Sequence, residues 1–193
     1  ALRTRLGLPR LGFAEAALDA DQHPTIVAAS PVLVPPAPDW GPLVHQTGFL
    51  VPPDRPYEPD PTLADFLAAG DAVFVGFGSL AGFTSPTEFE LLVEAGRRAG
   101  LPLVVHAPGD IPPGLVRPHV YAVGSVPHGW LFQRVAGVIH HGGAGTTHEG
   151  LRSGRPSAAI PFGVDQPYHA ARLHTLGVGP APLPLRRLRA DRL

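Results

Sequence analysis

The stretch HHGGAGTTHEG, residues 140–150, decides how this chain is interpreted. It follows an apolar run, Val135 to Ile139, that we predict to be a strand. Glycines at the end of a strand let the chain turn sharply and bring main-chain N–H groups close to a ligand. Thr146 and Thr147 then open a predicted helix, whose first N–H groups are unpaired and carry roughly half a positive charge. The stretch therefore predicts a site for an anion such as a diphosphate, although a turn that only packs tightly is the alternative.

Polar residues downstream of this turn are candidates for binding hydroxyl groups. Glu149 lies about one helical turn after Thr146, so its carboxylate projects near the same mouth, unless it only caps the helix or lies on the surface. Asp165 and Gln166 follow the predicted strand Ser157 to Ile160, at a strand-to-helix junction. An adjacent carboxylate and amide can bind several hydroxyl groups at once, and a sugar carries several neighbouring hydroxyl groups. The alternative is that Asp165 merely caps the next helix.

Short apolar strands alternate with helices along the chain. The predicted strands are residues 72–77, 103–106, 120–123, 135–139 and 157–160, and the predicted helices are residues 63–69, 86–99, 130–134, 145–152 and 166–176. Such an alternation predicts an α/β fold with a parallel sheet and helices on both of its faces. Ligands of such sheets bind beyond the carboxyl ends of the strands, where the motifs above lie.

The composition excludes several classes of function. Of the 193 residues, 44% are hydrophobic and 16% are charged, which is enough for one substantial core. The formal net charge of −1 gives no basic field for nucleic acid. The absence of cysteine excludes disulfides, thiolate nucleophiles and cysteine-ligated zinc. No apolar run approaches the ~20 residues that span a bilayer, so we expect a cytoplasmic protein, with peripheral membrane contact left open.

The motifs together resemble the donor-binding half of the inverting, metal-independent glycosyltransferases of family 1, which have the GT-B fold. The matching segments are GFGSL at 76–80, VPHGWLF at 126–132, HHGGAGTT at 140–147, GRPSAAIPFGVDQPYHAARL at 154–173 and LGVGPAP at 176–182. Among members, the chain resembles sterol and lipid glucosyltransferases and bacterial enzymes that glycosylate polyketide and glycopeptide antibiotics. The resemblance implies a Rossmann-like carboxy-terminal GT-B domain.

The resemblance also implies a role for each site residue. The expected donor-diphosphate contacts are Ser79, His141, Gly143, Ala144, Gly145 and Thr146. Glu149 is expected to bind the ribose, and Asp165 with Gln166 the transferred sugar. Plant members stack the base on a tryptophan near the position of Ser125, so here Val126 and His128 are the expected base contacts. No cofactor and no metal are expected besides the nucleotide diphosphate sugar, UDP-glucose or a dTDP-sugar.

The same resemblance gives the expected domain organisation. Residues 1–49 are expected to be a remnant of the amino-terminal acceptor domain, residues 50–61 a proline-rich linker, and residues 62–193 a donor-binding domain truncated at its carboxy-terminus. We also expect the natural start to be missing, because residue 1 is alanine and the sequence has no methionine. The catalytic base and the pocket for the small-molecule acceptor are then expected in the missing domain. The fragment alone is therefore expected to be inactive.

The function inferred from the resemblance is transfer of a hexose to a hydroxyl of a lipid, a sterol or a polyketide-like natural product. Two other functions stay open: a nucleotide-sugar-binding module that catalyses no transfer, and a GT-B epimerase or hydrolase. The other histidines also need an interpretation. We expect His140 to be buried and structural, and His148 and His169 to be surface or packing residues. A metal site formed by His128, His140 and His141 is the minor alternative, because the spacing matches no zinc pattern.

Overall fold

The computed structural model divides the chain into two compact units, Ala1–Pro52 and Pro53–Leu193. It describes residues 2–7, 9, 12, 22–51, 53, 56–78, 86–106 and 111–191. Ser79, an expected diphosphate contact, lies outside the described residues. The roles expected for residues 1–49, 50–61 and 62–193 stay predictions.

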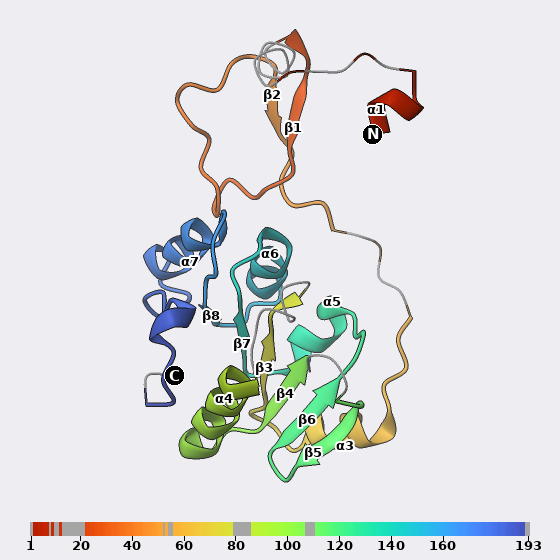
Figure 1. The fold of residues 1–193 in the computed structure, drawn as a ribbon, viewed down its shortest axis with the longest axis vertical. Coiled ribbons are helices and arrows are strands. Elements are labelled where there is room, and N and C mark those ends of the chain that lie inside the picture. The colour runs from red at the N-terminus through yellow and green to blue at the C-terminus, as the bar shows by residue number, and fades with distance from the viewer. Residues whose placement is uncertain are drawn as a thin grey trace. The chain divides into compact units, whose positions relative to one another are not determined.

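The first unit contains a two-stranded parallel sheet (Figure 1). Strand β1 (Thr25–Val27) pairs with β2 (Val44–Gln46), and Thr25 lies opposite Val44. The Gln46 amide nitrogen donates hydrogen bonds of 2.9 and 2.8 Å to the carbonyls of Ala29 and Val34. These bonds fix the segment between the two strands. The short helix α1 (Leu2–Arg5) also belongs to this unit.

The second unit is built on a six-stranded sheet with the strand order β5-β6-β4-β3-β7-β8. The strands are β3 (Val73–Gly76), β4 (Leu103–His106), β5 (Gly114–Arg117), β6 (Val120–Val123), β7 (Gly137–His140) and β8 (Ser157–Ala159). All neighbouring pairs are parallel except β5 with β6, which is antiparallel. The carboxyl ends of five parallel strands therefore meet at one edge (Figure 1).

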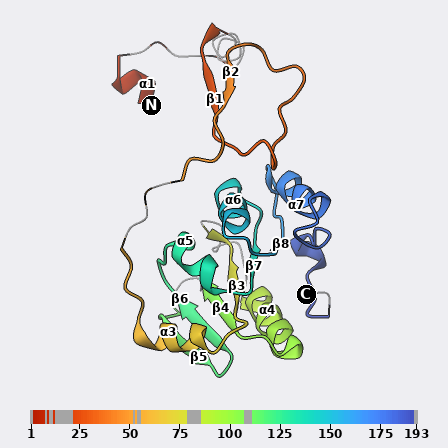
Figure 2. The same cartoon turned by 180° about the vertical axis from the view of Figure 1, so that it is seen from behind.

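Helices connect these strands and lie on both faces of the sheet, as Figure 2 shows from behind. They are α3 (Pro61–Ala68), α4 (Pro86–Ala99), α5 (His128–Leu131), α6 (Ala144–Arg152) and α7 (Gln166–Thr175), with the 3₁₀ turns η2 (Phe132–Arg134) and η3 (Leu185–Arg187). Helix α3 begins at Pro61 because Asp60 caps it and accepts the Thr62 N–H at 2.8 Å.

The two faces of the sheet bury separate apolar clusters, because side chains alternate along a strand. Phe74 and Val104 pack with residues of α3, α5 and η2, such as Leu63 and Leu131. Val75, the neighbour of Phe74, belongs to the opposite cluster with residues of α4. A third cluster places α7 against β8. Because both faces of the sheet are covered, side chains of both orientations are apolar, and the strands appear in the sequence as continuous apolar runs.

The predicted fold class is confirmed, with one addition to the sheet. The sequence prediction had no counterpart of β5, because GLVR carries no alternating pattern and is followed by a turn of two residues. The sheet is mostly parallel, as predicted, and β5 adds an antiparallel edge strand that the prediction did not contain. The strand predicted over residues 135–139 is β7, Gly137–His140, and the helix predicted from residue 145 begins at Ala144.

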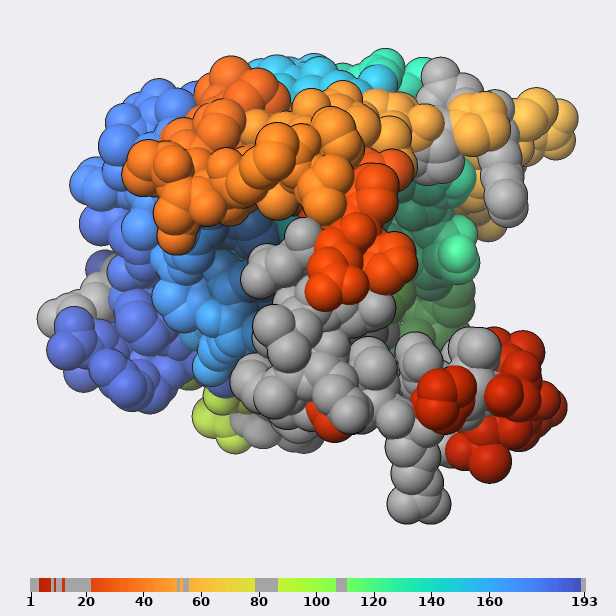
Figure 3. Space-filling model, turned by 90° about the horizontal axis from the view of Figure 1, so that it is seen from above, coloured from red at the N-terminus to blue at the C-terminus, as the bar shows by residue number. Residues whose placement is uncertain are grey.

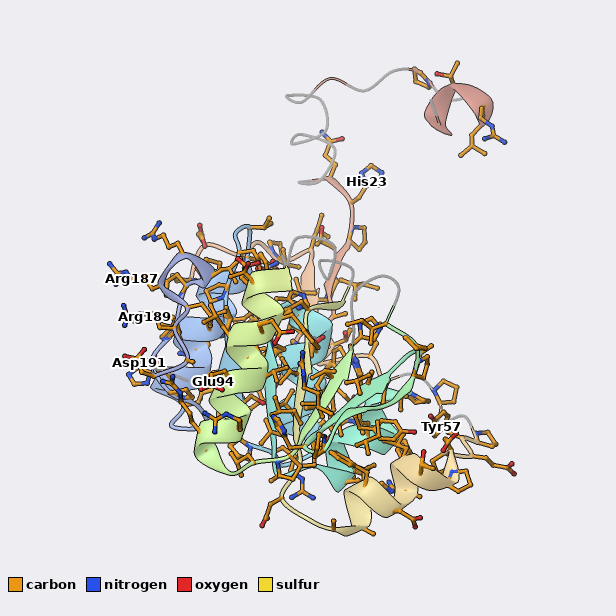
Figure 4. The ribbon with its side chains drawn as sticks, turned by 60° about the horizontal axis from the view of Figure 1, so that its bottom comes forward. His23, Tyr57, Glu94, Arg187, Arg189 and Asp191 are labelled. Carbon is orange, nitrogen blue, oxygen red and sulfur yellow. The ribbon has the colours of Figure 1, made fainter. Side chains whose placement is uncertain are left out.

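Ion pairs lie on the surface of the second unit, on α4 and on the segment near the carboxy-terminus. Glu94 on α4 binds Arg97 and Arg98, both at 2.7 Å. Figure 4 shows Arg187 and Arg189 pointing outwards, and Arg189 pairs with Asp191 at 3.1 Å. In the space-filling view of Figure 3, the blue atoms of α7 and of the segment after it lie together. None of the helices within the described ranges has the length and apolar character that a membrane crossing requires.

Leu63→Ala tests the cluster beneath α3. Leu63 is 2% exposed, so its truncation leaves a cavity and should lower the free energy of unfolding by about 2–5 kcal/mol, measured by urea denaturation. Leu115→Ala on β5 is the matched control, because Leu115 is 61% exposed and should change stability by less than about 0.5 kcal/mol. Equal losses in the two variants would contradict this packing.

Candidate functional site

Parallel pairing brings the candidate residues to one edge of the second unit's sheet. Gly76 at the end of β3 lies opposite His140 at the end of β7, and His106 at the end of β4 lies opposite Val123 of β6. Two cavities open at this edge, of about 140 and 50 Å³. They share Phe74, His106 and His128, so together they form one cleft beyond the strand ends.

The glycine loop after β7 is held at Gly142 from two sides. The Gly142 N–H donates to His140 Nδ1 at 3.0 Å, and the Gly142 carbonyl accepts a hydrogen bond from His169 Nδ1 at 2.9 Å. Gly142 has φ +92°, and a Cβ there would lie 2.9 Å from the Gln166 carbonyl. Glycine is therefore required here both by conformation and by space.

His140 has the structural role that the sequence predicted. Its side chain is fully buried, and burial lowers its pKa to about 3. The ring is therefore neutral at physiological pH. Its Nδ1 accepts the Gly142 N–H, so the proton is on Nε2, which has no hydrogen-bond partner.

The His141 ring lies between two glycines. A Cβ at Gly143 would overlap its Nε2, and a Cβ at Gly78 would lie 3.3 Å from its Cε1. The ring thus packs between the loop after β3 and the loop after β7. Burial lowers the pKa of His141, opposed by the charge of Asp165. Its Nδ1 is buried without a partner.

The start of α6 offers main-chain donors beside this ring. Gly143 is the N-cap residue, and no side chain caps the helix. The N–H groups of Ala144, Gly145 and Thr146 belong to the first turn, where an α-helix supplies no partner for them. Ala144 and Gly145 are exposed, and Thr146 lines the smaller cavity. This helix start can therefore receive an anion.

Glu149 lies on α6 in a buried ion pair. Its carboxylate is 11% exposed and accepts Arg152 Nη2 at 2.7 Å and Arg152 Nε at 3.1 Å. It does not cap α6, whose N-cap is Gly143. Arg152 and the Ser153 hydroxyl bind mainly Oε1, and among the described residues Oε2 accepts only Arg152 Nε, so Oε2 keeps capacity for a further donor.

Asp165 and Gln166 play different structural parts at the start of α7. Asp165 occupies the N-cap position, but its side chain makes no capping hydrogen bond and is 57% exposed. The Gln166 side chain is buried, and its Oε1 accepts the Phe162 and Gly163 N–H groups at 2.8 and 3.3 Å. Gln166 thus shapes the loop that presents Asp165.

The residues expected to bind a base line the larger cavity. Val126 and His128 belong to its wall, together with Gly124 and Ser125. The His128 ring stacks on Phe132 at 4.7 Å between centroids with an interplanar angle of 13°. Burial lowers the pKa of His128, while Glu149 raises it. The structure therefore brings these two residues to the cleft that Gly78 and Thr146 also line.

Sequence reasoning missed two residues of this site. His106 lines both cavities, and its Nδ1 is buried without a partner. Its signal was a polar residue at the carboxyl end of a predicted apolar strand. His169 is a packing residue, one of the two roles expected for it, and it is 5% exposed; its hydrogen bond to the Gly142 carbonyl was not expected.

His148 is likewise a packing residue, one of the two roles expected for it. It is 4% exposed, and its Nδ1 lies 2.7 Å from the Ala144 carbonyl one turn earlier. As for the metal alternative, within the described ranges no group of three or more His, Cys, Asp or Glu side chains is arranged to hold a metal ion.

Comparison with known proteins gives a family match over the carboxy-terminal part of the chain. The family model of the erythromycin biosynthesis protein CIII-like C-terminal domain matches residues 103–193. The match includes β4, the glycine loop, α6 and α7.

Two curated relatives match most of the chain. A sterol 3-beta-glucosyltransferase of Arabidopsis thaliana is 41% identical over 160 residues, which are 81% of this chain and 25% of the relative. The vancomycin aglycone glucosyltransferase of Amycolatopsis orientalis is 42% identical over 171 residues, which are 84% of this chain and 40% of the relative. The chain thus spans less than half the length of these relatives.

Solved structures agree in fold. The glycotransferase of kitacinnamycin has a TM-score of 0.71 at 22% identity and covers 88% of this chain and 44% of its own. The calicheamicin glycosyltransferase CalG4 has a TM-score of 0.65 at 19% identity and covers 98% of this chain and 51% of its own.

His140→Asn tests the neutral buried imidazole. The folded pKa of about 3 lies below the unfolded value of roughly 6.5, so the unfolded chain takes up the proton first as the pH falls. The contribution of the neutral His140 ring to the free energy of unfolding is therefore complete above about pH 6.5 and decreases as the pH falls. At pH 5 the free energy of unfolding is lower by about 2 kcal/mol for this reason. Asparagine keeps an acceptor for the Gly142 N–H but does not titrate. Urea unfolding at pH 7.5 and pH 5 should therefore show about 2 kcal/mol less acid loss in this variant.

His174→Asn is the control for this measurement, because His174 is exposed on α7. It should retain the pH dependence of the wild-type protein. An unchanged acid loss in His140→Asn would show that the buried ring is not the source.

Proposed function

Because the chain belongs to the family 1 glycosyltransferases of the GT-B fold, we propose that it supplies the donor site of an inverting hexosyltransferase. The observation that carries this proposal is the uncapped start of α6 beside His141, at the carboxyl edge of the sheet. A nucleotide diphosphate sugar binds there with its diphosphate at the first turn of α6. This placement follows from the unpaired N–H groups and the field of the helix.

The diphosphate is bound mainly by neutral donors in this proposal. The N–H groups of Ala144, Gly145 and Thr146 and the Thr146 hydroxyl point to it, and Gly143 allows the close approach. His141 completes the site as a neutral ring, because burial lowers its pKa. Ser79, which lies outside the described residues, is included in this proposal on the family resemblance alone. This set stabilises the leaving charge by hydrogen bonds and by the field of the helix, without a metal ion.

The remaining donor groups extend along the same edge. Asp165 and Gln166 hold the transferred sugar, and the exposure of the Asp165 carboxylate supports its role. Glu149 binds the ribose hydroxyls with the acceptor positions that Arg152 leaves. Val126 and His128 hold the base in the larger cavity. The names of two relatives specify a glucosyl group, which supports UDP-glucose as the donor, and we propose a dTDP-sugar as the alternative.

The reaction is a direct displacement at the anomeric carbon. An acceptor hydroxyl loses its proton to a base and attacks this carbon, while the bond to the diphosphate oxygen breaks and the nucleoside diphosphate leaves with inversion. Preorganised donors stabilise the departing charge, and loss of one such donor costs other enzymes on the order of 10²–10³ in turnover. In this proposal, the catalytic base belongs to a part of the enzyme outside this chain. The pocket that binds the lipid, sterol or polyketide-like acceptor belongs to the same part.

Calorimetric titration of the chain with UDP-glucose, dTDP-glucose and GDP-mannose tests the donor class. UDP-glucose or dTDP-glucose should bind with one site per chain, and GDP-mannose should bind more weakly. The larger cavity is only about 140 Å³, which favours the smaller pyrimidine ring. No heat with any donor, in a chain shown to be folded by circular dichroism, would refute the proposed donor site.

His141→Ala tests the diphosphate contact. Loss of the ring removes a donor beside the first turn of α6, so UDP should bind about tenfold more weakly, corresponding to about 1.4 kcal/mol. In an enzyme that also carries the acceptor domain, turnover at saturating acceptor should fall by about 10²–10³. His174→Ala, on the exposed side of α7, is the control and should bind UDP normally. Normal binding and transfer by His141→Ala would remove this residue from the role.

A further inference from the structure

We propose that His169 is a positioning residue that couples the glycine loop after β7 to the loop that carries Asp165. The inference rests on the proposed function, in which the first loop binds the diphosphate and the second binds the sugar. It is drawn from the contacts of one buried ring between two segments far apart in the sequence.

The contact with the glycine loop is a directed hydrogen bond. His169 Nδ1 lies 2.9 Å from the Gly142 carbonyl, which is 27 residues away along the chain. A carbonyl oxygen only accepts, so Nδ1 carries the proton. The ring is 5% exposed, and a hydrogen bond in such surroundings is not replaced by water when it is lost.

The same nitrogen also faces the second loop. Asp165 Oδ2 lies 3.8 Å from His169 Nδ1, and the His169 N–H binds the Asp165 carbonyl at 3.3 Å. Asp165 lies one helical turn before His169 on the same side of α7. The ring donates its Nδ1 proton to the glycine loop, and the exposed Asp165 carboxylate lies beside it, beyond hydrogen-bond distance, at the start of the same helix.

Main-chain packing between the loops supports the coupling. A Cβ at Gly142 would lie 2.9 Å from the Gln166 carbonyl, so the two loops are in close contact at that point. On its other side, Gly142 donates to His140 Nδ1. A shift of α7 is therefore transmitted to Gly142, and from there to the N–H groups at the start of α6.

Three substitutions separate positioning from packing. The Asn side-chain nitrogen lies near the place of Nδ1, so His169→Asn keeps a donor to Gly142. His169→Gln places its nitrogen farther out, near Nε2, and His169→Leu removes the donor. The thermal unfolding midpoint of each variant is measured as well, which shows whether the variant is still folded.

The experiment is calorimetric titration of each variant with UDP and UDP-glucose. His169→Leu should bind UDP about three- to tenfold more weakly than wild type, and UDP-glucose more weakly still, because the start of α7, which carries Asp165, is then no longer tied to the glycine loop. His169→Asn should retain UDP affinity within about threefold. Should His169→Leu fail to fold, His169→Gln takes its place and should bind more weakly than His169→Asn.

His119→Leu is the matched control. The His119 Nε2 also lies near a main-chain carbonyl from a distant segment, that of Val93 at 3.3 Å, but His119 follows β5, away from the cleft. It should bind both ligands as wild type does. Wild-type affinities in His169→Leu, equal affinities in the Asn and Gln variants, or an unchanged ratio of UDP-glucose to UDP affinity would overturn the coupling.

Amide hydrogen exchange without ligand separates this inference from the proposed function. The Gly142 N–H should exchange about tenfold faster in His169→Leu or His169→Gln than in wild type, and His119→Leu should leave it unchanged. If wild-type protein binds no nucleotide, the proposed function fails, and this measurement still decides the coupling. Unchanged exchange at Gly142 in the His169 variants would refute it.

Discussion

The site depends on the main chain at Gly142 being held from both sides. His140 accepts its N–H and His169 donates to its carbonyl, so both polar groups of this peptide segment are satisfied by buried rings. The positive φ and the close Gln166 carbonyl leave space only for glycine. This constraint fixes the direction in which the chain enters α6 and therefore where the unpaired N–H groups point.

The electrostatics of the cleft rest on dipoles more than on side-chain cations. Burial lowers the pKa of His128, His140 and His141, so these rings are neutral at physiological pH. The basic Arg152 is held by Glu149. The positive end of α6 is then the main fixed attraction for an anion here. Such donors require no reorganisation when charge develops on a leaving group.

The second unit brings this chemistry together through its sheet. Parallel strands end at one edge, so residues separated by many positions, such as His106 and Thr146, reach the same cleft. The apolar clusters on both faces hold the strands in register, and a slip by one residue would exchange the two faces. The register that packs the core therefore also fixes which residues reach the site.

The sequence by itself determined the α/β class, the bounds of α4, β4 and β6, and the buried role of His140, because periodicity and glycine position are local properties. It also indicated the loops that carry His141 and Asp165. Only the tertiary structure decided that β5 runs antiparallel, that His106 lines the cleft and that His169 binds Gly142. Those features depend on contacts between segments far apart in the chain, and no local pattern of residues encodes which distant partner a strand or a ring will meet.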